Sequence, residues 1–286
     1  MEYLATGCPS LDALLDGGLE RDAITLVFGE GGSGKTNLAL QCARQAARKG
    51  LRIAYVDTEG VSSVRLRQVF EGDGTEPNRP QGNSGGSKPS DRGFESSGNE
   101  GNPDPSVALP DPPLMDQSGG GQVATLQSEA PHTTPQDRID ELEARVLFFT
   151  PYTIEEQERL VQNATRVPDL GLVVVDSINM HYRLHIDGGD ESEKEAARSL
   201  YKQLHHLTGF ARQHNVPVLV TGQVYGGEDT TQPFARRVME HLVKALVRFE
   251  KRPDGSRRAT VIKHRSIEEG RTARFRIANH GLIAAE

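Results

Sequence analysis

The stretch DAITLVFGEGGSGKT, residues 22–36, decides the fold of this chain. Its first half, from Ala23 to Phe28, is a run of apolar and β-branched residues without helical spacing, which predicts a short buried strand. Its second half has a glycine, four residues and then Gly-Lys-Thr, the pattern of a loop that wraps a polyphosphate. A helix is expected to begin at Gly34, with its positive end facing the anion.

Each residue type in this loop has a chemical reason to be there. Glycines let successive backbone N–H groups curl around phosphates without a Cβ in the way. Lys35 is expected to be a surface residue that sets its charge against the outer phosphates, while the hydroxyl of Thr36 is offered to Mg²⁺. The residues predicted to hold the nucleotide are Gly29, Glu30, Gly31, Gly32, Ser33, Gly34, Lys35 and Thr36.

Two polar side chains are expected at the ends of other strands. Glu59 follows the strand 53–57, at the strand tips where ligands bind in open α/β sheets, and is placed to act on a water near the outermost phosphate. Gln223 follows the strand 216–221 and is placed to sense that phosphate. A solvated acidic turn at Glu59, and a polar residue leaving a strand at Gln223, are the open alternatives.

A second magnesium ligand is predicted at the end of another strand. The four apolar residues 172–175 end in Asp176, and a carboxylate there can hold Mg²⁺ through its water shell, in line with Thr36. Such a pattern is weak alone, because buried strands often end in aspartate. It gains weight from the phosphate loop upstream.

Length and composition bound the class of protein. The 286 residues can hold one large domain or two small ones. The two cysteines, Cys8 and Cys42, indicate neither a disulfide framework nor a zinc site. No signal peptide and no run of 18 apolar residues is found, so a cytoplasmic protein without a membrane span is expected.

The net charge of −7 belongs to one segment. Residues 72–140 carry 11 acidic and 4 basic residues, 10 of the 16 prolines and a single aromatic residue, Phe94. Such a stretch cannot bury enough apolar area to offset the entropy of ordering it. It is predicted to be a disordered acidic Gly/Pro/Ser-rich insertion within one domain, because strand and helix patterns resume after it.

The C-terminal third is basic. Residues 236–276 hold 13 basic and 5 acidic residues, and antiparallel strands are expected at 242–250, 258–264 and 273–278. A basic meander of this kind can track a phosphate backbone, which makes Arg236 and Arg237 candidate DNA contacts. An ordinary basic surface that faces the acidic insertion is the alternative.

Residues 180–190 are predicted to form an exposed loop. Its Tyr182 and Arg183 are further candidate DNA contacts. The pair His181 and His185 has the spacing of metal ligands on a helix, but a third ligand and a helical pattern are missing, so a metal site is not expected.

Together these residues resemble the RecA/RadA recombinase superfamily, and most closely its archaeal RadB branch. The resemblance covers nearly everything outside 72–140. It runs through Tyr55–Gly60, Val173–Ser177, Thr221–Tyr225 and Lys263–Ser266, in addition to the phosphate loop. It implies an α/β fold with a RecA-like P-loop NTPase core: a mostly parallel sheet flanked by helices, with antiparallel C-terminal strands. Residues 1–71 and 141–286 would then form a single RecA-like ATPase domain.

The resemblance also implies the chemistry. Lys35 and Thr36 would bind ATP and Mg²⁺, with Asp176 as the second metal carboxylate. Glu59 would be the catalytic carboxylate and Gln223 the γ-phosphate sensor. RadB proteins bind DNA and hydrolyse ATP very weakly without exchanging strands. A nucleoid-associated regulator of recombination and repair is therefore expected, with a RadA-like recombinase or a branched-DNA nuclease as partner. A strand-exchanging recombinase and a KaiC-like regulatory ATPase without DNA are the alternatives.

Two features stand apart from the pattern. Gly222 occupies a position where the family commonly has Asn, which questions how tightly Gln223 is coupled to the nucleotide. Lys263 and Arg265 lie at the end of a predicted C-terminal strand, and three interpretations are open: contact with DNA, contact with the nucleotide of a neighbouring subunit, or a solvated strand end.

Overall fold

The structure is a computed structural model that describes residues 3–72, 134–182, 190–224 and 241–285, all within one compact unit. The strands are β1 (Tyr3–Leu4), β2 (Leu19–Glu20), β3 (Ile24–Gly29), β4 (Arg52–Asp57), β5 (Val146–Phe149), β6 (Leu170–Asp176), β7 (Val218–Gln223), β8 (Ala245–Lys251), β9 (Arg257–His264), β10 (Thr272–Ala278) and β11 (Gly281–Ala284). The helices are α1 (Pro9–Leu14), α2 (Lys35–Arg48), α3 (Ser63–Glu71), α4 (Pro135–Glu143), α5 (Ile154–Ala164) and α7 (Asp190–His214).

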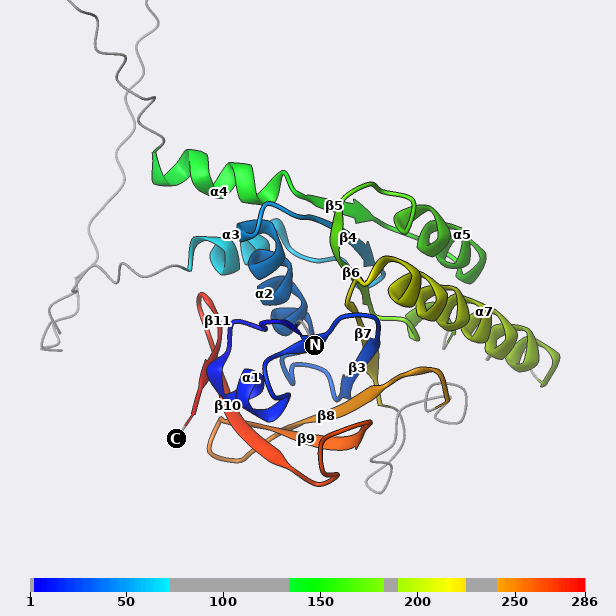
Figure 1. Cartoon of the computed structure of the whole chain (residues 1–286). Coiled ribbons are helices and arrows are strands. Elements are labelled where there is room, and N and C mark those ends of the chain that lie inside the picture. Colours follow the sequence, from blue (N-terminus) through cyan, green and yellow to red (C-terminus); the bar gives the residue numbers. More distant parts are fainter. Residues whose placement is uncertain (1–2, 73–133, 183–189, 225–240, 286) are drawn as a thin grey trace, which may run out of the picture. The chain divides into compact units, whose positions relative to one another are not determined.

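One large sheet organises these elements (Figure 1). Its order in the described residues is β11-β10-β9-β8-β3-β7-β6-β4-β5, while β1 and β2 form a separate two-stranded ribbon. The strands from β8 to β5 run parallel, and β9, β10 and β11 continue the sheet antiparallel. The predicted fold class, a mostly parallel sheet with antiparallel C-terminal strands, is confirmed.

The inner parallel strands β3, β4, β6 and β7 are buried on both faces, which explains their unbroken apolar runs. One core cluster joins α1, α2 and α3 to alternate residues of the sheet, such as Val27 and Val174. A second cluster joins α5 and α7 to the opposite set, such as Leu26 and Val175. Alternation of side chains along each strand therefore gives two hydrophobic layers, one on either side of the sheet.

A buried glutamine on α2 ties the two ends of the chain to this sheet. Gln41 donates from Nε2 to the carbonyls of Gly7 (2.6 Å) and Leu282 (3.1 Å), and its Oε1 accepts from the Leu282 N–H (2.6 Å). The amide thus replaces main-chain partners for the hairpin formed by β10 and β11. The sequence analysis missed β11.

The predicted end of the acidic insertion, at residue 140, is wrong. Residues 135–143 form helix α4, which Thr134 caps: its hydroxyl accepts from the Asp137 N–H, and Asp137 reciprocates. This capping box is worth about 1 kcal/mol, and Ile139 and Leu142 pack against the first core cluster. Local capping and two apolar contacts therefore outweigh the acidic composition of this short stretch. The remainder of the predicted insertion, 73–133, lies outside the described residues.

Candidate functional site

Polar groups meet where four neighbouring parallel strands end. In the register of the sheet, Asp57 of β4 lies opposite Asp176 of β6, and Gly29 of β3 lies opposite Gln223 of β7. The carboxyl ends of parallel strands share one edge, the usual place for a ligand in such sheets. These groups come from positions as far apart in the sequence as 29 and 223, so only folding brings them together.

The loop between β3 and α2 is built from glycines for steric reasons. A Cβ on Gly29 would lie 2.1 Å from the carbonyl oxygen of Phe249, so no other residue fits there. Gly32 and Gly34 have φ values of 71° and 106°, in the region that favours glycine. Helix α2 begins at Lys35, so its unpaired N–H groups face the loop and provide an anion-binding end.

Lys35 is not the surface residue that the sequence analysis expected. Its side chain is only 6% exposed, and Nζ donates to the carbonyl oxygens of Gly29 (2.9 Å) and Glu30 (3.0 Å). Burial lowers the pKa of Lys35, while the nearby carboxylates of Glu59 and Asp176 raise it. The lysine is therefore held inside the curl of the loop by carbonyl groups that a bound phosphate would compete with.

Asp176 is a buried carboxylate whose oxygens both accept hydrogen bonds from hydroxyl groups. Tyr55 Oη donates to Oδ2 (2.7 Å), and the Thr221 hydroxyl donates to Oδ1. Burial raises the pKa of Asp176, and the hydroxyls of Thr221, Tyr55 and Thr36 oppose that rise. Thr36 and Asp176 thus lie side by side, as the sequence predicts.

The donor set at this point fits Mg²⁺. Mg²⁺ is usually held by one or two protein oxygens and keeps several waters or substrate oxygens. Thr36 and Asp176 would supply one hydroxyl and one carboxylate, next to the phosphate loop. Among the described residues, no cluster of three His, Cys, Asp or Glu is close enough to form a metal site made by protein alone.

Glu59 is held by two donors at one oxygen. The Ser177 hydroxyl donates to Oε1 of Glu59 (2.6 Å), and Gln223 Nε2 donates to the same atom (2.8 Å). Thr58 and Ser177 also exchange hydrogen bonds, 2.8 Å each, between the Thr58 side chain and the Ser177 main chain. The structure therefore brings Glu59 and Gln223 into contact.

Sequence reasoning missed four polar residues that surround the predicted ones. They are Tyr55, Ser177, Asn179 and Thr221, each within a few positions of Asp176, Glu59 or Gln223. Their nearness to strand ends was the available signal.

Lys251 and Arg257, from the β8–β9 hairpin, also reach the phosphate loop: the Lys251 N–H donates to Glu30 (3.2 Å), and Arg257 donates to the Gly32 carbonyl (3.4 Å).

The predicted exposed position of Tyr182 is wrong. Tyr182 is 3% exposed and belongs to the core cluster that includes α5 and α7, because residues 180–182 form a helical turn rather than an open loop. A ring in that cluster cannot stack on DNA. Arg183, Arg236 and Arg237 lie outside the described residues.

The two basic residues at the end of β9, Lys263 within the strand and Arg265 just after it, have partners within the chain. Lys263 Nζ donates to the Val243 carbonyl (3.2 Å). Arg265 pairs through Nε with Glu20 (2.8 Å) and through Nη2 with Asp22 (3.2 Å), and Glu20 is only 3% exposed. Arg265 therefore compensates a buried carboxylate, an interpretation that the sequence analysis did not consider.

His181 lies against a main-chain carbonyl group. Its Nε2 lies 3.0 Å from the Pro151 carbonyl oxygen, and the ring is 8% exposed. His185 lies outside the described residues.

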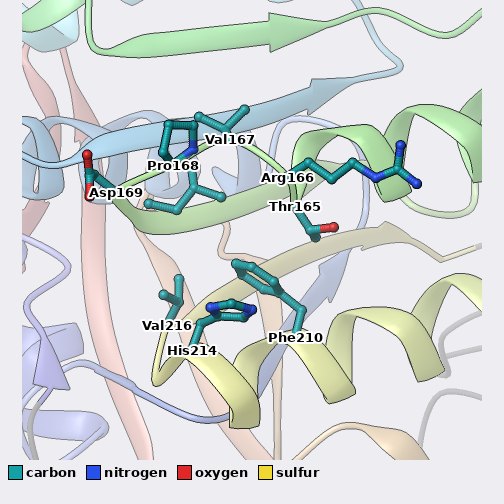
Figure 2. A pocket seen from close by; sticks show the side chains of 9 residues that line it. Thr165, Arg166, Val167, Pro168, Asp169, Phe210, His214 and Val216 are labelled. Atoms are coloured by element: carbon teal, nitrogen blue, oxygen red, sulfur yellow. The ribbon is translucent and has the colours of Figure 1, made fainter.

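A cavity of about 550 Å³ lies beside Leu170 and Val216, at the amino ends of the strands (Figure 2). It is therefore at the opposite end of the sheet from the phosphate loop. Within the described residues, no helix has the length and apolar character needed to span a membrane.

Comparisons with known families agree with this arrangement. The family model described as "ATPase: KaiC" matches residues 4–78, and the model described as Rad51 matches residues 137–285. The second match covers more than half of the chain and includes β6, β7 and the C-terminal strands.

Individual relatives match from end to end. The DNA repair and recombination protein RadB of Thermococcus kodakarensis is 31% identical over 99% of this chain and 100% of its own length. RadB of Thermoplasma acidophilum is 30% identical over 98% of this chain and 93% of its own. A solved structure described as "Crystal structure of the RadB recombinase" is 29% identical, covers 99% of this chain and all of its own, and superposes with a TM-score of 0.66.

Proposed function

Because this chain belongs to the RadB family within the RecA/Rad51 recombinases, we propose that it binds ATP with Mg²⁺ and also DNA, and acts in homologous recombination and DNA repair. The observation that carries the nucleotide part is the meeting of Lys35, Asp176, Glu59 and Gln223 at one edge of the sheet. Four side chains of complementary chemistry at the mouth of a phosphate loop are what phosphoryl transfer requires.

The proposed roles follow from the contacts. The loop 29–36 would hold the phosphates, with Lys35 exchanging its carbonyl partners for phosphate oxygens. Thr36 and Asp176 would hold Mg²⁺, which neutralises charge on the phosphates when bound. Gln223 would contact the outermost phosphate and Glu59 would orient the attacking water.

We further propose that ATP hydrolysis is very slow. Glu59 Oε1 already accepts hydrogen bonds from Ser177 and Gln223. The two donors occupy the lone-pair sites of that oxygen, so a water that Glu59 orients has to displace one of them or bind at Oε2. Weak turnover is also what the resemblance to RadB proteins implies, and a regulatory part in the processing of branched DNA fits it better than strand exchange.

A KaiC-like ATPase without DNA is the second candidate, since the KaiC model matches residues 4–78. The full-length RadB relatives favour the first candidate. We propose DNA contacts at Arg183, Arg236, Arg237 and Lys263, whereas Arg265 would have to leave its carboxylate partners to contribute. A nucleoid location and a RadA-like recombinase or branched-DNA nuclease as partner belong to the same proposal. So does a single ATPase domain interrupted by the acidic segment.

Two binding titrations test the proposal. Lys35→Ala is expected to weaken ATP binding roughly a hundredfold, about 2.7 kcal/mol, while Lys49→Ala, at the exposed end of the same helix, serves as the matched control. ATP binding by the Lys35 variant that equals wild type would reject the site. Binding of a DNA oligonucleotide across a salt series tests the second part, because phosphate contacts give an affinity that falls with salt. A protein that binds ATP but no DNA at low salt would favour the KaiC-like candidate.

A further inference from the structure

Strand β7 extends past the end of its neighbour β6. The two strands pair as far as Val175 opposite Val220, and the Ile178 N–H then donates to the Thr221 carbonyl (3.0 Å) as the chain turns away. In a strand, the N–H and C=O of one residue point to the same side, so Gln223 directs both groups towards the place that β6 has left. Gln223 is partly buried, and main-chain groups at such a strand end need partners.

The side chain of Asn179 supplies both partners. Its Nδ2 donates to the Gln223 carbonyl oxygen (2.8 Å), and its Oδ1 accepts from the Gln223 N–H (3.0 Å). Asn179 is 1% exposed, so its amide is turned away from bulk water. Among small side chains, only a primary amide offers a donor and an acceptor in the geometry of a peptide group. Asn179 therefore acts as a one-residue extension of β6.

Gly222 lies beside this amide, and a Cβ added there would meet the amide at an ordinary van der Waals distance. A Cβ at position 222 would lie 3.7 Å from Asn179 Oδ1, on the side of the sheet away from Thr221 and Gln223. The departure from Asn at this position, noted from the sequence, thus coincides with an amide brought in from residue 179. Side chains two residues apart on a strand share a face, so Thr221 reaches Asp176 while Gln223 reaches Glu59.

We propose that Asn179 is a positioning residue that fixes the main chain of Gln223 and thereby aims its side chain at Glu59 and at the outermost phosphate. The part that concerns phosphate rests on the proposed function. With both main-chain groups of Gln223 held, its Nε2 lies within 2.8 Å of Glu59. Without them, the end of β7 is held on its β3 side, where the Val224 N–H donates to the Gly29 carbonyl (3.4 Å).

A structural measurement without nucleotide tests the two hydrogen bonds between the Asn179 side chain and the Gln223 main chain. Amide hydrogen exchange of the full chain is followed by NMR for wild type, Asn179→Ala and Asn179→Asp. Exchange at the Gln223 N–H is expected to quicken roughly fivefold or more in the Ala variant, the factor for losing one hydrogen bond. The Asp variant keeps an acceptor and loses the donor, so it guards against a fold lost to the Ala change. Unchanged exchange at Gln223 in a folded Ala variant would overturn the proposal.

A double-mutant cycle tests the consequence for the nucleotide. The readout is the ratio of affinities for a non-hydrolysable ATP analogue and ADP, both with Mg²⁺. Gln223→Ala is expected to lower this ratio about fivefold to tenfold, Asn179→Ala by a similar factor, and the double variant no further. Gln203→Ala is the matched control, since Gln203 is a buried amide (2% exposed) on α7 whose Oε1 accepts from Gln157 of α5, within the helical layer and not at the strand ends.

The outcomes separate the two proposals. A ratio that falls in the Gln223 variant and stays at wild type in the Asn179 variants would overturn the positioning role and leave the proposed function standing. A ratio that stays at wild type in the Gln223 variant would overturn the sensor role of Gln223. An equal fall in the Gln203 control would mean that any loss of a buried amide has this effect, which also overturns the positioning role.

Discussion

The phosphate-loop edge of the sheet and its basic C-terminal strands handle charge in opposite ways. At the phosphate-loop edge, Lys35 donates to two main-chain carbonyls. The carboxylates of Asp176 and Glu59 accept from hydroxyl groups and, at Glu59, from the Gln223 amide. In the C-terminal strands, cations pair with acids: Arg258 with Glu250 and Arg274 with Asp254 inside the same stretch, and Arg265 with Glu20 and Arg271 with Asp16 from the N-terminal part of the chain. A positive count over a stretch of sequence therefore overstates the charge that is available to DNA.

The largest expected effect concerns Tyr182, which the sequence placed with the DNA contacts and the structure places in the core. Tyr182→Ala is expected to lower the free energy of unfolding by about 3 kcal/mol, because a large ring leaves a cavity. Tyr182→Phe, which keeps the ring, is expected to bind DNA as wild type does. Chemical denaturation and DNA titration measure the two quantities. Weaker DNA binding by the Phe variant would instead indicate that the Tyr182 hydroxyl contributes to DNA binding.

A smaller loss of stability is expected when the ion pair between Arg265 and the buried Glu20 is removed. Arg265→Ala leaves the Glu20 carboxylate buried without its cation and is expected to cost roughly 2 kcal/mol of stability. Arg271→Ala, whose pair with Asp16 is exposed on both sides, is expected to cost under about 1 kcal/mol. Denaturation curves compare the two. A DNA salt slope reduced by about one in the Arg265 variant, with stability intact, would instead assign this arginine to DNA.

The smallest effect is a pH dependence at the turn between β8 and β9. Hydrogen bonds from the side chain and backbone of Ser256, and the charge of Arg274, lower the pKa of Asp254 below its ordinary value of 3.8. Its folded form thus binds a proton more weakly than the unfolded chain does. The stabilisation is present above that ordinary value and is lost as the pH falls through the lower, folded one. The difference between wild type and Asp254→Asn should therefore shrink in acid denaturation. A difference in unfolding free energy that is the same at every pH would show that the hydrogen bonds, and not the charge of the Asp254 carboxylate, cause it.

Local patterns in the sequence were enough for the phosphate loop, the parallel strands and the residues at their ends. Period, glycine placement and capping act within a few residues, and parallel strands put their carboxyl ends at one edge whatever their order. Glu59, Asp176 and Gln223 could be named as candidates on that basis, while a solvated turn at Glu59 and a polar strand end at Gln223 stayed open. Helix α4 was missed because composition was averaged over a long acidic stretch that ends in a short capped helix.

Only the tertiary structure decided which side chains meet. The contact of Gln223 with Glu59 joins residues 164 positions apart, and that of Arg265 with Asp22 joins residues 243 apart. Strand order and packing set such pairs, and neither leaves a local periodic trace. The same reason explains Lys35 and Tyr182, which were expected to be exposed and which the enclosing layers bury, and it explains Asn179, for which no local pattern predicted a role beside β7.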